Sequence, residues 1–386
     1  MAALREYLDR VGFDQLYKNL ATATRYTLTP SVVARQTASG VDKYFDVSLG
    51  DSPETSLLKC LLIGDPVAID SLADEERALA GLLIDAQILE YDFDRATIKG
   101  ATYQLISAFG IRLLIDRRIH FGPELHDIYI GPDSYAMLYY VDVADIDRNS
   151  RVLDLCTGSG ISALYLSLFS DDVTATDIGA EPLRLSEYNI ALNRRDDAVK
   201  LRNENLSDTL NSGERFDVIT CNPPFVAMPP GHPGMLYATG PGIDGLDYVR
   251  QIVSSLPGLL KPGGVAYIVA DLIGGRHGPY LLKEIEAFAK AQGMQVDAMI
   301  DAVLPAEIQA EAMASLISLA DRSLQGQPSR DQVNAFYHDT LRVENFYLTT
   351  LKIRTSQASG GVRMLHRDLL PKFVDAPKWP NLLLRH

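Results

Sequence analysis

Tryptophan, cysteine and histidine are scarce in this sequence of 386 residues, which contains 1 Trp, 3 Cys and 7 His. Cys60, Cys156 and Cys221 show no C-x-x-C spacing, and the histidines form no H-E-x-x-H or comparable ligand cluster. The sequence therefore indicates neither a disulfide framework nor a metal site.

Long apolar runs are missing as well, because charged residues interrupt every stretch that could otherwise span a bilayer. The first 20 residues mix charged residues with apolar ones at Leu4, Tyr7, Leu8 and Val11, which suits an amphipathic helix better than a secretory signal. We therefore expect a cytoplasmic protein with no membrane partner.

Basic residues are outnumbered: 36 Lys and Arg against 50 Asp and Glu give a formal net charge of -14. This charge would repel a polyphosphate, whereas nucleic-acid binders usually carry a basic patch. A local basic patch in an acidic protein would still permit nucleic acid, but a protein or a small molecule is the favoured substrate. The sequence leaves the oligomeric state open, with a homodimer among the options.

The chain is longer than one ordinary domain, so we expect two, residues 1–125 and 126–386. The first shows helical segments and then short strands within 88–99 and 103–116, an order that predicts a mainly helical, winged-helix-like accessory domain. Such units often bind DNA, but residues 65–92 carry eight acidic residues against Arg77 alone. A substrate-selecting or dimerising role is therefore the better interpretation.

From residue 151 onward, short β-rich runs alternate with helical stretches, which is typical of an α/β fold with a doubly wound, Rossmann-like parallel sheet. Seven strands fit a sheet like that of class I methyltransferases. The predicted strands are 151–155, 173–177, 199–202, 216–221, 265–270, 295–301 and 344–355.

Residues 305–343, between the last two predicted strands, are expected to form a helical hairpin. Its first helix stops near Gly326, and Ser329 and Gln332 have capping-box spacing at the start of its second helix. We favour packing against the sheet over a lid. The apolar residues of the two helices are Ile308, Met313, Leu316 and Ile317, then Val333, Phe336, Tyr337 and Leu341.

A glycine-rich turn, Asp154-Leu-Cys-Thr-Gly158-Ser-Gly160, follows the first predicted strand and opens into a helix. Its glycines allow a tight turn and let backbone amides approach a ligand. Asp177 ends the second strand, where a carboxylate can accept both ribose hydroxyls. Because the spacing is D-x-x-x-G-x-G and not G-x-G-x-x-G, a cofactor without a diphosphate is favoured.

This stretch resembles motif I of class I S-adenosylmethionine-dependent methyltransferases. The resemblance implies S-adenosyl-L-methionine as cofactor and S-adenosyl-L-homocysteine as product. It places Asp177 at the ribose and Asn205, the best match for a polar residue after the third strand, at the adenine. The other residues that it implies at the cofactor are Asp154, Thr157, Gly158, Gly160 and Asn222.

The tetrapeptide Asn222-Pro223-Pro224-Phe225 leaves the fourth strand at the edge where doubly wound folds bind ligands. A nitrogen next to a carbonyl, an aromatic ring or a guanidinium attacks poorly, because its lone pair is delocalised. The Asn222 side-chain oxygen and the Pro223 carbonyl can accept hydrogen bonds from such a nitrogen, and Phe225 can stack on it. We predict these three residues to be catalytic and infer no histidine base, His232 included.

The N-P-P-[FY] motif is shared by methyltransferases of protein glutamine amides and of exocyclic amino groups on nucleic-acid bases. Together with Gly131-Pro-Asp-Ser134, Gly242-Ile-Asp-Gly245-Leu, Arg250 and a Pro-Gly-Gly turn, it resembles the release-factor glutamine methyltransferase family over about residues 130–269. That family typically has Tyr in place of Phe225.

The resemblance implies N-methylation of a protein glutamine or a related amide. N-methylation of a small amino-acid-like or natural-product metabolite is one alternative, and methylation of an RNA or DNA base is another. A non-catalytic cofactor-binding protein is a fourth.

Overall fold

The computed structural model describes residues 1–23, 53–64, 66–100, 103–116, 128, 130–231, 238–320, 330–355 and 360–366. No helix in these ranges is both long and apolar enough to cross a bilayer. The same residues contain no cluster of three or more His, Cys, Asp or Glu suited to a metal ion.

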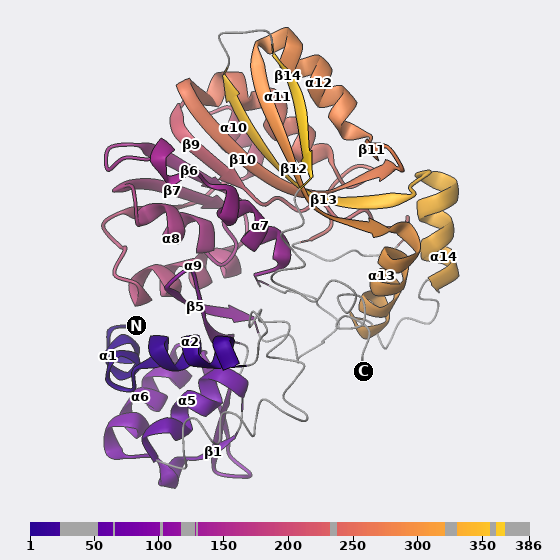
Figure 1. The fold of residues 1–386 in the computed structure, drawn as a ribbon. Helices are drawn as coiled ribbons and strands as arrows, with labels where there is room; N and C mark the ends of the chain where they lie inside the picture. The colour runs from indigo at the N-terminus through magenta and orange to yellow at the C-terminus, as the bar shows by residue number, and fades with distance from the viewer. Residues whose placement is uncertain are drawn as a thin grey trace.

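A nine-stranded sheet dominates the chain from residue 151 onward, in the order β14-β12-β13-β10-β9-β6-β7-β8 with β11 beside β10 (Figure 1). Strands β6 to β10 run parallel, whereas β13 runs antiparallel to both of its neighbours. The strands are β6 Arg151–Leu155, β7 Asp172–Asp177, β8 Val199–Asn203, β9 Phe216–Cys221, β10 Leu260–Gly275, β11 Gly278–Pro279, β12 Met294–Pro305, β13 Asn345–Thr355 and β14 Gly361–His366.

The Rossmann-like fold is confirmed, but the prediction of seven strands is incomplete. Strands β6 and β9 have the predicted bounds, while β10 and β12 extend well beyond theirs. Two further strands add to the seven: the two-residue β11, and β14, which pairs in parallel with β12 at the edge of the sheet. The edge strand was missed because none of its residues is buried, so it lacks the apolar pattern of a core strand.

Helices cover both faces of the sheet, and β10 shows how its residues divide between them. Val265, Tyr267 and Val269 belong to one buried cluster, while Ala266 and Ile268 belong to the other. This alternation is the period-two pattern of a strand buried on both sides. The first face carries α7 Pro132–Tyr140, α8 Ile161–Ser167 and α9 Ala180–Leu192, and the second carries α10 Leu206–Leu210, α11 Asp247–Leu259 and α12 Leu281–Gln292.

The N-terminal region begins with two helices, α1 Ala2–Arg10 and α2 Phe13–Ala23. The prediction of one amphipathic helix over the first 20 residues is therefore wrong. The chain turns at Gly12, whose φ of 65° lies in the left-handed region that a continuous helix excludes. The apolar spacing was sound, because Leu4, Tyr7 and Leu8 are buried.

The next elements are one helix, a short strand, a 3-10 turn, a second helix and a β-hairpin, and the winged-helix-like accessory domain stays a prediction. Strands β1, β3 and β2 form a small three-stranded sheet. A separate hairpin follows, in which β4 pairs with β5. The elements are α5 Pro53–Ile63, β1 Val67–Ala68, the 3-10 turn η1 Ile69–Ser71, α6 Asp74–Asp85, β2 Leu89–Asp92, β3 Thr97–Gly100, β4 Tyr103–Ala108 and β5 Ile111–Asp116.

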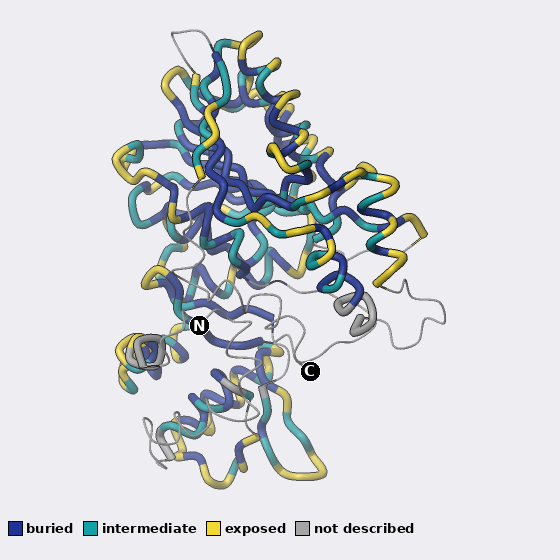
Figure 2. Tube along the Cα trace, turned by 45° about the vertical axis from the view of Figure 1, so that its right-hand side comes forward, coloured by how far each residue is buried: buried dark blue, intermediate teal, exposed yellow. Residues whose placement is uncertain are grey.

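The β4–β5 hairpin packs against α9, and two asparagines of that helix seal its edge. Asn193 accepts from the Arg112 backbone N–H at 3.0 Å and donates to the Arg112 carbonyl at 2.7 Å. Asn189, one helical turn earlier, pairs with the N–H and the carbonyl of Leu114 at 2.7 and 2.9 Å. One buried cluster also runs from α1 through the hairpin into α8 and α9 (Figure 2). The predicted domain boundary at 125/126 lies outside the described residues.

Between β12 and β13 lie α13 Ala306–Ala320, α14 Arg330–Ala335 and a π-helical turn, η3 Phe336–Thr340. Met313, Val333, Phe336 and Tyr337 are buried in the cluster on the second face of the sheet, and Leu341 packs against it. Gly326 and Ser329, and the side chains of Leu316 and Ile317, lie outside the description.

Candidate active site

The glycine-rich turn joins β6 to α8 at the carboxyl edge of the sheet. Cys156, Gly158 and Gly160 all have positive φ, at 56°, 54° and 81°. A Cβ atom at Gly160 would lie 3.0 Å from Ser186 Oγ, so glycine is required there both by the backbone and by the space available. The turn therefore packs tightly on α9.

Asp154 lies at the base of this turn and is almost fully buried. Its Oδ2 accepts a hydrogen bond from Thr157 Oγ1 at 2.6 Å, and its Oδ1 accepts one from Thr220 Oγ1 at 2.7 Å. Burial raises the pKa of this carboxyl to about 6, although both hydroxyl donors act to lower it. Asp154 thus ties the turn to β9, the strand that leads into the tetrapeptide.

Asp177, at the end of β7, closes the other side of the turn. Its Oδ2 accepts from the Gly158 backbone N–H at 3.0 Å, and its Oδ1 accepts from the Gly179 N–H at 2.9 Å. Burial raises the pKa of Asp177, and these backbone donors oppose the shift. The structure therefore brings together the turn and the predicted ribose carboxylate.

Asn205 caps α10. Its side-chain oxygen accepts from the Asp208 N–H at 2.9 Å, and its side-chain nitrogen donates to the Asp208 carboxylate. The whole amide is thus engaged in the helix cap. Asn203, two residues earlier, donates to the Ile178 carbonyl at 3.0 Å and lies opposite Asp177 in the sheet.

Ile178 follows the predicted ribose carboxylate, and 72% of its surface is exposed. An exposed large apolar side chain beside a polar ligand site offers a packing surface for a flat ring. The sequence interpretation missed this residue, although an isolated isoleucine directly after Asp177 was a usable signal.

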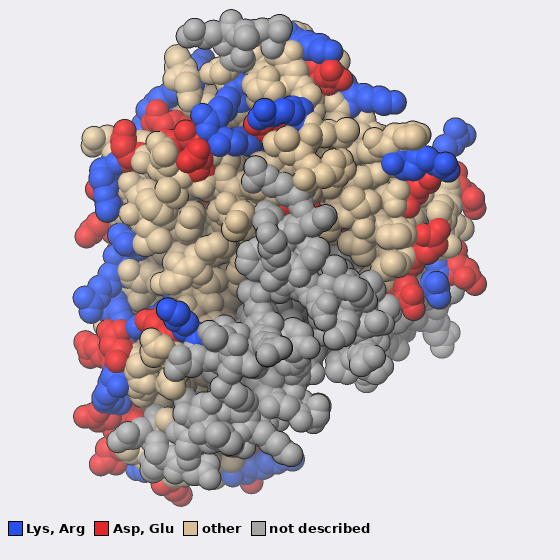
Figure 3. Space-filling model, in the orientation of Figure 1, with Lys and Arg blue, Asp and Glu red and all other residues tan. Residues whose placement is uncertain are grey.

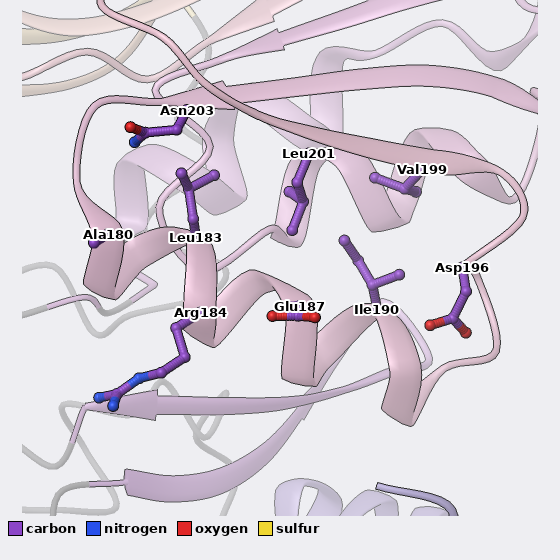
Figure 4. A pocket seen from close by; sticks show the side chains of 9 residues that line it. All are labelled: Ala180, Leu183, Arg184, Glu187, Ile190, Asp196, Val199, Leu201 and Asn203. Atoms are coloured by element: carbon purple, nitrogen blue, oxygen red, sulfur yellow. The ribbon is translucent and has the colours of Figure 1, made fainter.

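A hollow of about 560 Å³ lies next to this region, along α9 and the outer edge of β8 (Figure 4). Leu183, Ile190 and Leu201 form its apolar wall, and Asn203 lies at one end. None of the predicted site residues lines it, so it is not the predicted cofactor site.

Asn222 leaves the end of β9 and faces the first turn of α7. Its side-chain nitrogen donates to Asp133 Oδ2 at 2.6 Å and to Ser134 Oγ at 3.2 Å. An ionised carboxylate only accepts, so this contact decides which end of the amide faces α7. The Asn222 oxygen accepts no hydrogen bond from the part of the chain that the structure describes.

The segment that carries the G-x-D-G-L string packs against the backbone of the tetrapeptide. The Phe225 N–H donates to the Ala238 carbonyl at 3.0 Å. A Cβ atom at Gly245 would lie 2.5 Å from the Phe225 carbonyl oxygen, and one at Gly240 would lie 2.7 Å from the Pro224 oxygen. Only glycine permits this approach, so the segment fixes the backbone that carries Phe225.

Arg250 secures the same segment from α11. It forms two hydrogen bonds with Asp244, at 2.6 and 3.0 Å, and a third with Glu284 at 3.0 Å. These carboxylates raise the pKa of Arg250 and keep it charged. Arg250 therefore supports the tetrapeptide indirectly, through the segment that packs against its backbone.

Two acidic residues near Asn222 were not predicted as site residues. Asp133 contacts Asn222 directly, and Asp271 lies on β10 within electrostatic reach of Asp133. An aspartate inside the otherwise apolar run Val-Ala-Tyr-Ile-Val-Ala-Asp-Leu-Ile was the available signal for Asp271. His232 lies outside the described residues.

A Rossmann-like sheet with a glycine-rich turn after its first strand and Asn-Pro-Pro-Phe after its fourth defines a class I methyltransferase domain. Residues 136–277, which contain both features, match the family model of the methyltransferase small domain.

Curated relatives are similar to part of the chain. The release factor glutamine methyltransferase of Clostridium acetobutylicum is 33% identical over 148 residues, covering 35% of this chain and 51% of the relative. The ribosomal protein uL3 glutamine methyltransferase of Bordetella pertussis is 38% identical over 133 residues, covering 32% and 44%. The chain thus spans about half the length of these relatives. The resemblance to the glutamine methyltransferases is confirmed in this region.

Among solved structures, an S-adenosylmethionine-dependent methyltransferase from Agrobacterium tumefaciens is 13% identical with a TM-score of 0.43. The match covers 67% of this chain and 71% of that one.

Proposed function

We propose that the chain is an S-adenosylmethionine-dependent N-methyltransferase whose acceptor is the side-chain amide of a protein glutamine. Two relatives that are similar to about a third of the chain are named as protein glutamine methyltransferases. The amide of Asn222 is the observation that carries the proposal.

Asp133 and Ser134 hold the nitrogen of Asn222, so its oxygen is left to accept a hydrogen bond from the substrate. A glutamine amide can donate one N–H to this oxygen and the other to the Pro223 carbonyl. Both acceptors would then stabilise the positive charge that develops on nitrogen. Phe225, which is half-buried, would lie against the planar amide group.

The residues around the turn fit the proposed cofactor, which supplies an electrophilic methyl group when bound. Gly158 and Gly160 would accommodate its amino-acid end, with Thr157 and Asp154 holding the turn from beneath. Asp177 would bind the ribose, and Ile178 would pack on the adenine. Any contact from Asn205 would come from its backbone, because its side chain caps α10.

A small cationic metabolite is the second candidate, and the Asp133–Asp271 pair beside Asn222 is the observation that favours it. Two neighbouring carboxylates would attract an amine or a guanidinium. A nucleic-acid base has less support. On the face shown in Figure 3, basic side chains of the described residues lie among acidic ones and form no stripe.

The test is to incubate the purified full chain with S-adenosylmethionine and, separately, with total protein, total RNA and a metabolite extract. Mass spectrometry then locates the added methyl group. We expect a gain of one methyl on glutamine in the protein pool, absent with Asn222→Ala. Methylation confined to the RNA or metabolite pool would replace this proposal with one of its alternatives.

A further inference from the structure

Asp271 occupies a defined place beside the tetrapeptide. Strand β10 runs parallel to β9 with Ile268 opposite Cys221, so β10 continues three residues past the end of β9 to reach Asp271. The alternation along β10 puts Asp271 on the face of Val265, Tyr267 and Val269, which α7 covers. The first turn of α7 is the element that holds Asn222.

Asp271 is half-buried. Unlike the other carboxylates of the site, its carboxylate forms no hydrogen bond or ion pair with any residue that the structure describes. The titratable groups that face it are Asp133 from α7 and Tyr337 from η3. Tyr337 lies close to the loop after the tetrapeptide, since its hydroxyl donates to the Ala227 carbonyl at 3.4 Å. Asp271 thus lies near α7, which holds Asn222, and near η3, which contacts the loop after the tetrapeptide.

Loss of solvent and the nearby charge of Asp133 raise the pKa of Asp271 to about 7. A carboxylate with a near-neutral pKa holds a proton more firmly than an ordinary one and still ionises at physiological pH. Burial and Asp271 together raise the pKa of Tyr337, which therefore stays neutral over this range.

We propose that Asp271 is the group that receives the proton lost by the acceptor nitrogen during methylation, a role that rests on the proposed function. The geometry behind the proposal is a carboxylate without a partner, placed next to the elements that orient the acceptor. Asn222 accepts a hydrogen bond from the substrate amide and so orients it, whereas Asp271 removes a proton from the amide nitrogen.

The step balances without a further reactant. The nitrogen–carbon bond forms while the carbon–sulfur bond breaks, and the electron pair of that bond stays on sulfur. One nitrogen–hydrogen bond then breaks, its electron pair returns to nitrogen, and the proton bonds to a carboxylate oxygen of Asp271. The product is a neutral N-methyl amide, and the protonated Asp271 releases its proton to water after the product leaves.

The first experiment compares pH–rate profiles of the full-length wild type, Asp271→Asn and Asp271→Glu. The rate is that of S-adenosylhomocysteine formation with the total protein of a cell extract. The wild-type rate should rise with pH up to about 7, because Asp271 must be ionised to receive the proton. Asp271→Asn should be roughly 100-fold slower or more, with no such rise, and Asp271→Glu should recover part of the rate and the rise.

Asp297→Asn is the matched control, because this carboxylate also belongs to the sheet but pairs with Arg363 on the edge strand β14. Its profile should match the wild type. A rate for Asp271→Asn within threefold of the wild type, or a retained rise with pH, overturns the proposal. Should Asp271→Asn fail to fold, the profile of Asp271→Glu decides: a profile identical to that of the wild type overturns it.

A second measurement does not depend on turnover. In protein labelled with 13C-carboxyl aspartate, NMR should show one carboxyl that titrates near pH 7 and disappears in Asp271→Asn, while S-adenosylmethionine affinity is unchanged. No such titration would refute the role of Asp271. If the titration is present but the wild type methylates nothing in the protein pool, the proposed function fails. The role of Asp271 as the group that receives a proton from a glutamine amide then fails as well.

Discussion

The two halves of the carboxyl edge of the sheet use carboxylates in opposite ways. On the cofactor half, Asp154 and Asp177 each accept two hydrogen bonds from the protein itself. On the acceptor half, Asp271 accepts none from the described residues and lies near a second carboxylate, Asp133. The carboxylates of the cofactor half are thus hydrogen-bonded within the protein, whereas Asp271 of the acceptor half is available to a bound substrate.

This difference separates a part of the site that is already ordered for binding from a part whose carboxylate can still pair with a substrate. A satisfied network holds the turn rigid before any ligand arrives, which is preorganisation. A carboxylate without donors instead costs free energy that a substrate N–H would recover. The comparison predicts which substitutions change affinity, stability or turnover.

Asn222→Ala should have the largest effect, because it removes the acceptor oxygen from the acceptor half and leaves the cofactor half intact. We expect kcat to fall by roughly 100-fold to 1,000-fold, by analogy with loss of one charge-stabilising group. Steady-state kinetics gives this number, and calorimetric titration should show unchanged S-adenosylmethionine affinity. Asn149→Ala, at an exposed asparagine, serves as the control. A loss of S-adenosylmethionine affinity as large as the loss of kcat would contradict the separation of a cofactor half from an acceptor half.

Asp154→Asn should remove a pH dependence of stability from the cofactor half. The folded-state pKa of about 6 lies above the ordinary value of 3.8, so ionisation is disfavoured in the folded protein. Stability from this group is therefore fully present below about pH 4 and is lost as the pH rises through about 6. A shift of about 2 units corresponds to about 3 kcal/mol.

Urea unfolding of both proteins between pH 4 and pH 8 measures this effect. The free energy of unfolding of Asp154→Asn, relative to wild type, should increase with pH across that window. A difference independent of pH would show that Asp154 does not titrate as described. Thr220→Val, which removes one hydroxyl donor, should move the loss to higher pH.

Asp177→Ala should weaken S-adenosylmethionine binding by about 10-fold to 100-fold, the value of a hydrogen bond to a charged group. At saturating cofactor, kcat should change much less, because the acceptor half is untouched. Titration calorimetry and kinetics at high cofactor concentration separate the two effects. Asp172→Ala, at the start of the same strand, should leave affinity unchanged. Unaltered binding by Asp177→Ala would remove this residue from the cofactor site.

Ser134→Ala should have the smallest effect, since its 3.2 Å contact with Asn222 is the weaker of the two that hold the amide. We expect kcat to fall about 2-fold to 10-fold, as for one neutral hydrogen bond. Asp133→Asn should cost more, because an amide no longer dictates which end of Asn222 faces it. Equal losses in the two variants would argue against orientation by the carboxylate.

Local sequence patterns predicted most of the sheet, because strands such as β6, β9 and β10 carry dense apolar runs bounded by turn residues. The turn at Gly158 and Gly160 and the tetrapeptide at Asn222 were equally visible, since their conformation needs particular residue types. The break at Gly12 was missed because the apolar spacing continues across it.

Asp271 and Ile178 were missed for a different reason. Their significance depends on strand register and on exposure, which involve residues distant in sequence. Asn205 was singled out because its position after the third strand matches that of a cofactor residue. In the structure its amide caps α10, and its contact with the cofactor stays a prediction.

The asparagine pair on α9 has a consequence for how this protein can be rebuilt. Asn189 reaches both Leu114 in the hairpin and the Ser159 carbonyl in the glycine-rich turn, at 2.9 and 2.8 Å. Deleting residues up to 116 would leave this fully buried amide without its strand, next to the turn that is proposed to bind the cofactor. An N-terminal region exchanged between homologues would therefore have to supply a strand in the same register, or be moved together with α9, whose asparagines pair with that strand.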